Sequence, residues 1–129
     1  MQKKPYYQKR RDLAFTIVEV NQFQREGLEA IAEPMAELFM WTIKTALGDK
    51  QHRIRGMAAS YLGVLNHQPA IPLLMKALED DHAHVRASAA LAFCRMRTKE
   101  AKPKLEVMMK EDWDQTVRSR SREAVERMS

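Results

Sequence analysis

The side chains that could do chemistry in this sequence of 129 residues are four histidines and one cysteine. The histidines stand at positions 52, 67, 82 and 84, and the last two are too close together for the i, i+4 spacing that places two metal ligands on one helix face. Cys94 follows Phe93 in an expected helix, and no histidine is placed by the sequence to activate its thiol, so we interpret it as a packing residue. Without a cysteine–histidine cluster or a glycine-rich phosphate loop, we expect no catalytic residues, no metal, no cofactor and no enzymatic activity.

The composition indicates one folded, helical domain that spans residues 1–129. Hydrophobic residues make up 45% of the chain and charged residues 30%, which is too apolar for a disordered protein. Only 4 glycines and 5 prolines interrupt a sequence rich in good helix formers. A single cysteine excludes an intrachain disulfide, and no apolar run approaches the roughly 20 residues that span a bilayer. We therefore expect a cytoplasmic protein without membrane contact, and no signal peptide, because the apolar stretch 13–20 is short and contains Glu19.

An internal repeat organises the sequence. The segment 54–62 recurs at 85–93, a spacing of 31, and again in a weaker form at 117–125, a further 32 residues along. Pro72 and Pro103 stand 17 residues after Arg55 and Arg86, so the second half of the unit repeats in step with the first. Each unit predicts two helices, an A helix with small residues on one face and a B helix that starts near the proline.

The apolar columns follow this repeat at helical spacing. In the A helices they are Ile54, Ala58, Leu62, Leu65 and Val85, Ala89, Phe93, Met96, and in the B helices they are Leu74, Leu78 and Leu105, Met109. One period earlier, residues 35–48 are expected to form a B helix and 22–33 its A helix, an atypical unit because Gln24 replaces the arginine. The expected units are 22–50, 51–81 and 82–112, with a capping helix at 113–129 and a helix or a flexible arm at 1–21.

On these residues the chain resembles the HEAT repeat family, and in particular the short HEAT-like repeats also found in phycobilin lyase subunits. The resemblance covers roughly residues 22–128 and rests on Ile54-Arg55, Val85-Arg86 and Val117-Arg118 with the small residues that follow each pair. It implies a right-handed α-solenoid of antiparallel helical hairpins, a HEAT/armadillo-like superhelix. It also implies a buried ladder in which loop aspartates meet the repeated arginines: Asp49, Asp81 and Asp112 or Asp114 against Arg55, Arg86 and Arg118. A desolvated arginine needs such carboxylate partners.

The last unit departs from the pattern. Ser121 and Arg122 replace an alanine pair, and no B helix follows. A polar face suits a terminal cap. Two sharper interpretations stay open: a basic contact patch formed by Arg118, Arg120, Arg122 and Arg127, and a homodimer in which a second chain completes the unit.

The B helices predict a partner-binding face. Aligning them gives outward columns whose mixture of apolar anchors and lysines is typical of protein interfaces: Trp41, Thr45, Leu73, Lys76, Lys104 and Val107. Trp41 has the alternative of covering one end of the core.

The net charge of +5 is unevenly distributed, with basic ends and an acidic segment at 12–50. We predict a protein–protein interaction scaffold that uses the B-helix face. The alternatives are nucleic-acid binding through the basic C-terminal helix and the N-terminal arm, and a subunit of a lyase-type enzyme.

Overall fold

A computed structural model describes residues 40–129 of the chain. The expectations for an arm or helix at 1–21, for an A helix at 22–33 and for the beginning of the B helix at 35–48 lie outside the described residues. Residues 40–47 of that B helix are described and are helical.

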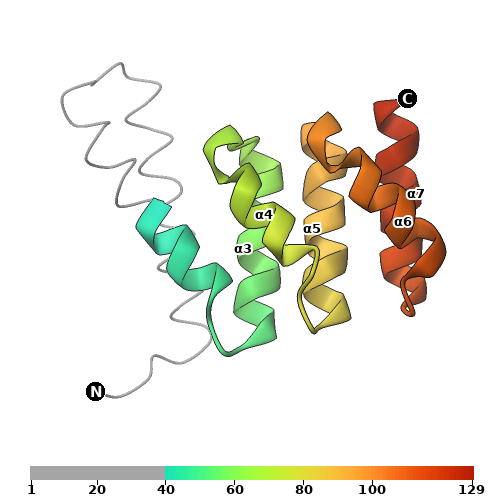
Figure 1. Ribbon diagram of the computed structural model, residues 1–129. Coiled ribbons are helices and arrows are strands. Elements are labelled where there is room, and N and C mark those ends of the chain that lie inside the picture. The colour runs from blue at the N-terminus through green and yellow to red at the C-terminus, as the bar shows by residue number, and fades with distance from the viewer. Residues whose placement is uncertain (1–39) are drawn as a thin grey trace.

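The described helices form two layers (Figure 1). The A helices α3 (His52–Leu65), α5 (Ala83–Met96) and α7 (Gln115–Met128) stand side by side, and α5 packs against both α3 and α7. The B helices, which are the helix at 40–47, α4 (Ile71–Ala77) and α6 (Lys102–Glu111), cross in front of them. The protein is an all-α solenoid in which each helical pair buries its apolar side against the next.

The turns inside the two described hairpins have the same construction. Each A helix ends at a residue whose backbone is in the left-handed conformation. This residue is Asn66 after α3 and Arg97 after α5, and both have a φ of 53°. A short 3₁₀ helix follows each turn, η1 (Gln68–Ala70) and η2 (Lys99–Ala101), and the B helix then starts with proline in its first turn. Proline is tolerated there because the first N–H groups of a helix have no partner within it.

The predicted apolar columns form the core, with one correction. Ile54, Ala58 and Leu62 of α3 are buried, as are Val85, Ala89, Phe93 and Met96 of α5, and Leu74, Leu78 and Leu105 of the B layer. In α6, Met108 and not Met109 continues the stripe after Leu105, and Met109 is only half-buried. Residues three and four positions on both lie on the same helix face, so spacing fits either methionine, and the packing of α6 against α7 selects Met108.

The A helices approach one another closely where the sequence has glycine. A Cβ atom on Gly63 would lie 2.5 Å from the Cα of Ala92 and 2.8 Å from its Cβ. A Cβ atom on Gly56 would lie 2.6 Å from Nε2 of His84. Gly63 therefore allows the backbone of α5 to pack closely against α3, whereas the neighbour of Gly56 is the end of the His84 side chain.

Candidate functional site

A ladder of arginines joins the loops that begin the A helices. In each of the three described units the Nη1 atom donates to the carbonyl of the preceding loop aspartate at 2.7 Å: Arg55 to Asp49, Arg86 to Asp80, and Arg118 to Asp112. In the first two, the Nε and Nη2 atoms donate to the carboxylate of the next loop. Arg55 binds Asp80 at 2.8 and 3.0 Å, and Arg86 binds Asp112 at 2.9 and 3.2 Å. Each of these two guanidinium groups thus ties together two successive loops, the one before its own A helix and the next one along the chain.

The loop aspartates also fold their own turns. One carboxylate oxygen of Asp49, Asp80 and Asp112 accepts the backbone N–H two residues on, at 2.8 to 2.9 Å. The expected ladder included Asp81, and this is corrected: the carboxylate in this column is that of Asp80, and Asp81 supplies only its carbonyl, to Arg86. The physical reason is that the i+2 turn orients the first residue of the acidic pair toward the arginine. Asp114 instead caps α7 by accepting from the N–H of Val117.

The ion pair of Arg86 is more buried than that of Arg55. The side chains of Arg55 and Asp80 are each 15% exposed, and those of Arg86 and Asp112 are 9% and 8% exposed. The hydrogen bond to Asp80 raises the pKa of Arg55. Burial alone would raise the pKa of Asp80, but hydrogen bonds from Arg55 and from the backbone of His82 outweigh it, so the pKa is lowered. The Arg55–Asp80 ion pair is therefore charged at neutral pH. Both ion pairs couple neighbouring units.

Trp113 covers the second ion pair and was not predicted. It lies between Asp112 and Asp114, and the guanidinium carbon of Arg86 stands 5.1 Å from its ring centroid, within the range of a cation–π contact. Nevertheless, 73% of Trp113 is exposed, more than any other large apolar residue among those described. The equivalent loop positions are Lys50 and Asp81, so the repeat itself gave no signal for an aromatic residue there.

The residues of the predicted B-helix face lie in the B layer at different depths. Trp41 is 64% exposed and Val107 is 50% exposed, whereas Leu73 is half-buried and packs against the core. Thr45 and Lys76 are exposed. The Nζ atom of Lys104 lies 3.3 Å from a carboxylate oxygen of Glu79. Trp41 is thus a surface residue, which excludes the alternative that it covers the end of the core.

A groove of about 310 Å³ runs between the helix at 40–47 and α4. Its apolar lining comes from Leu47, Leu73 and Ala77, and its charged lining comes from Lys44, Lys76 and Asp80. Leu73 and Lys76 belong to the predicted face. Lys44 and Leu47 were not predicted, although a spacing of three residues on one helix was a usable signal for them.

Three histidines gather at the beginning of α3 and α5. The rings of His52 and His82 are stacked with centroids 4.1 Å apart, and His84 meets His52 edge-on at 6.2 Å. Burial lowers the pKa of His52, and the positive charges of His82 and His84 lower it further. Within residues 40–129 no group of three histidine, cysteine, aspartate or glutamate side chains has an arrangement that could hold a metal ion.

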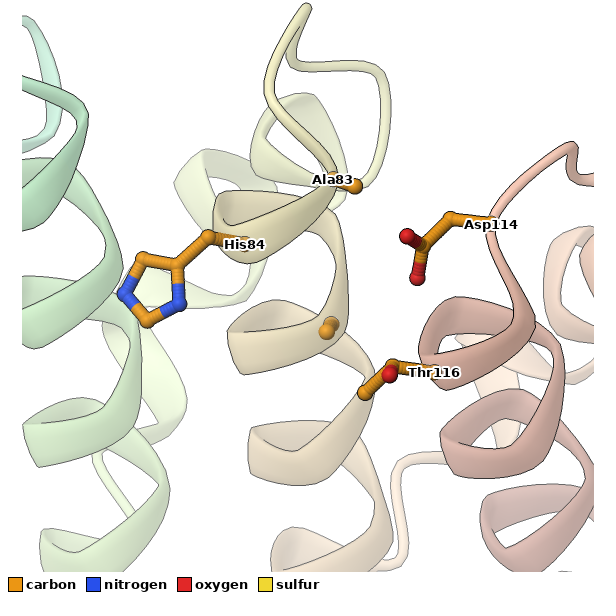
Figure 2. Close-up of a pocket in the computed structure, with 5 residues that line it drawn as sticks. Ala83, His84, Asp114 and Thr116 are labelled. Atoms are coloured by element: carbon orange, nitrogen blue, oxygen red, sulfur yellow. The ribbon is translucent and has the colours of Figure 1, made fainter.

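A second cleft, of about 260 Å³, lies between α5 and α7. Figure 2 shows Asp114 and Thr116 on the α7 side, facing Ala83 and α5, whereas the imidazole of His84 points the other way, toward α3. The polar side chains on the α7 side of this cleft are thus a carboxylate and a hydroxyl, and the His84 ring is aimed away from it. Cys94 is buried.

Two of the four arginines in the predicted basic patch on α7 contact other groups of the protein, and the other two are exposed. Arg118 is engaged through Nη1 by the carbonyl of Asp112, and Arg120 lies 3.5 Å from Glu123. Arg122 and Arg127 are exposed. Contact with nucleic acid through this patch, or with a second chain, stays a prediction.

Comparison with known proteins identifies the repeat. The family model described as HEAT repeats matches residues 41–126, which is more than half of the chain. A search of curated proteins finds no match. None of the helices in the described part of the chain is long and apolar enough to cross a membrane.

Proposed function

Because the chain belongs to the HEAT repeat family, whose members are commonly protein-interaction scaffolds, we propose that it is a non-catalytic module that binds a partner protein through its B-helix face. We propose the same division into units as the repeat indicates: 22–50, 51–81 and 82–112, closed by the capping helix at 113–129. The binding face consists of Trp41, Thr45, Leu73, Lys76, Lys104 and Val107.

Two observations in the B layer support this proposal: a groove between the helix at 40–47 and α4, and apolar side chains exposed on the same layer. Trp41 and Val107 stand out from the surface at 64% and 50% exposure, and the groove offers a floor that includes Leu73. Aromatic and aliphatic anchors next to a pocket are the features that concentrate binding energy at protein interfaces. Lysines beside them form the polar rim that such interfaces require.

Site-specific photo-crosslinking tests this face in cells that express the full chain. A photoreactive phenylalanine analogue replaces Thr45 in one variant and Lys76 in another, because both positions are exposed on the face. The matched control carries the same analogue at Val64 of α3, which is 65% exposed but lies outside the B layer. We expect both face positions to give an adduct with one and the same protein, and Val64 to give none with it.

A substitution in the groove then tests affinity for that protein. Leu73→Asp places a carboxylate in the groove floor, and we expect it to weaken binding by at least about tenfold. Circular dichroism establishes that this variant keeps its helices. Adducts that form equally at Val64, or adducts with nucleic acid in place of protein, would contradict the proposal.

A further inference from the structure

The contact between α3 and α5 has histidine rings at the end where both helices begin. His52 of α3 stacks on His82, the N-cap residue of α5, with ring centroids 4.1 Å apart, and His84 meets His52 edge-on. The ring of His84 reaches the backbone of α3, because a Cβ atom on Gly56 would lie 2.6 Å from its Nε2 atom. Three imidazole rings therefore occupy the space between the beginnings of these two helices.

The next contact, between α5 and α7, has a cleft at the equivalent place. The helices α3, α5 and α7 are each 14 residues long, so their positions can be matched one to one. At the three histidine positions the α5–α7 contact has smaller side chains, and all three line the cleft of about 260 Å³: Ala83 for His52, Asp114 for His82, and Thr116 for His84. The cleft thus corresponds to the space that the rings take up one unit earlier.

The two sides of the cleft differ in chemistry. Ala83 and Ala87 are four residues apart and lie on one face of α5, which makes that side apolar. On the α7 side, Figure 2 shows the side chains of Asp114 and Thr116 directed toward α5. The Oδ1 atom of Asp114 accepts the N–H of Val117 at 3.0 Å, which fixes the side chain. Within residues 40–129 its other oxygen, Oδ2, has no hydrogen-bond or ion-pair partner.

The size and the acceptor in this cleft favour a small ring that carries an N–H group. Sites for drug-sized ligands measure about 300 to 1,000 Å³, and this cleft is smaller. A flat ring can lie on the alanine methyl groups while its edge meets the carboxylate. A protonated imidazole has an N–H at both ring nitrogens, and a charged donor gives the stronger hydrogen bond to a carboxylate. Imidazole is also the group that the chain itself places at the equivalent position.

We propose that the cleft between α5 and α7 binds an imidazole ring, which lies against Ala83 and Ala87 and donates an N–H to Oδ2 of Asp114. The source of the ring is a histidine side chain of a partner protein or a small imidazole compound, and the two sources share this chemistry. The site lies between A helices, so it does not depend on the B-helix face.

Nuclear magnetic resonance of the backbone amides tests the proposal on the full chain. The probe is 4-methylimidazole, the analogue of the histidine side chain, at about pH 6, below the ordinary imidazole pKa of about 6.5. We expect saturable shifts of the amide signals of Ala83, Ala87 and Thr116, while that of Gly56 in the α3–α5 contact stays in place. Thiazole is the matched control, because it has the same ring size and no N–H, and we expect it to bind about tenfold more weakly.

Two variants test the carboxylate and the space separately. Asp114→Asn keeps an oxygen that caps α7 but places an amide donor where Oδ2 was, so we expect about tenfold weaker binding. Asp81→Asn in the preceding loop is the matched control and should leave binding unchanged, because Asp81 is exposed and does not line the cleft. Ala83→His restores the ring found at the equivalent position of α3, so we expect it to block the probe. Circular dichroism establishes that each variant keeps its helices.

A capped glycine–histidine–glycine peptide distinguishes the two sources of the ring. Binding of the peptide as tightly as 4-methylimidazole assigns the site to a protein side chain, and exclusion of the peptide assigns it to a small compound. Equal binding of thiazole and 4-methylimidazole, or undiminished binding by Asp114→Asn, would overturn the site. Larger shifts of these amides with inorganic phosphate would show an anion site at the beginning of α7 and would overturn it as well.

Discussion

Single side chains in the ladder make unequal contributions to folding, because the three arginines have different numbers of partners. Arg86 makes four hydrogen bonds, two of them to the buried carboxylate of Asp112. Arg55 makes the same set around Asp80 in a more exposed setting. Arg118 makes one, to a carbonyl. Removing one member of a buried ion pair leaves the other charge without compensation, which costs more than losing a single hydrogen bond.

We therefore predict a graded loss of stability on alanine substitution. Arg86→Ala should lower the free energy of unfolding by about 3 kcal/mol. Arg118→Ala should lower it by about 1 kcal/mol, the value of one hydrogen bond. Arg55→Ala should fall between them because its ion pair is more exposed to water. Urea titrations followed by circular dichroism measure the three values, and an Arg118→Ala loss as large as that of Arg86→Ala would show that Arg118 has partners equivalent to those of Arg86.

The ladder shows how far single side chains could be predicted. The arginines and the presence of loop aspartates follow from the repeat, but an acidic pair such as Asp80-Asp81 offers two candidates one residue apart. The choice is made by the turn, in which Asp80 accepts the N–H of His82 and so points back to Arg55. Trp113 had no column partner, and its position over Arg86 depends on a tertiary contact that no local pattern encodes.

Between helices, the distance from α3 to α5 is set by the side chain that is missing at Gly63. Glycine within a helix costs about 1 kcal/mol relative to alanine, so its presence in the middle of α3 needs a compensating contact. The compensation is the approach of Ala92, whose Cα would be 2.5 Å from an added Cβ. Because this neighbour is the backbone of α5, it cannot move away from an added Cβ as the end of a flexible side chain could.

We predict that Gly63→Ala lowers the free energy of unfolding by about 2 kcal/mol, although alanine is the better helix former. Gly48→Ala is the matched control, because its added Cβ would meet nothing closer than 3.5 Å. We expect the control to change stability by less than about 0.5 kcal/mol. Thermal unfolding of both variants measures the difference, and a neutral or stabilising Gly63→Ala would show that α3 and α5 are farther apart than described.

The helices themselves were largely predictable because two independent signals agree on them. The period of 31 to 32 residues places each A helix, and the prolines at 72 and 103 place the start of each B helix. The face of α6 was harder, since both Met108 and Met109 fit a helical stripe after Leu105. Packing against α7 selects Met108, and that neighbour is known only once the chain has folded.

Across the chain, the stability of each unit depends on its contacts with the neighbouring units, so a change at one contact alters the stability of the whole array. Stacked repeats fold through their interfaces, because no single hairpin can bury its apolar side alone. The α3–α5 contact combines the close approach at Gly63, the rung from Arg55 to Asp80, and the histidine stack at the helix starts. The stack could not be predicted from the sequence, because His52 and His82 are 30 residues apart and come together only when successive units pack.

The histidine stack predicts that acidification weakens this contact. The pKa of His52 is lowered from 6.5 in the folded protein by burial and by the charges of His82 and His84, and those of Arg53 and Arg55 act in the same direction. The unfolded chain therefore takes up a proton more readily than the folded one. The contribution of His52 to the free energy of unfolding is therefore fully present above pH 6.5 and falls as the pH drops below that value. Asp80 acts in a separate window, because its pKa is lowered from 3.8 and its contribution is lost only in stronger acid.

Urea titrations between about pH 7.5 and 5 follow this loss. His52→Gln should flatten the decline. His67→Gln provides the comparison, since the pKa of His67 is lowered by burial and without any charge contribution. High salt should reduce the part due to His52, where repulsion between positive groups contributes, and leave the part due to His67 nearly unchanged, because salt screens charges but does not hydrate a buried ring. An unaltered pH profile in His52→Gln would mean that the stacked rings do not couple α3 and α5 to protonation.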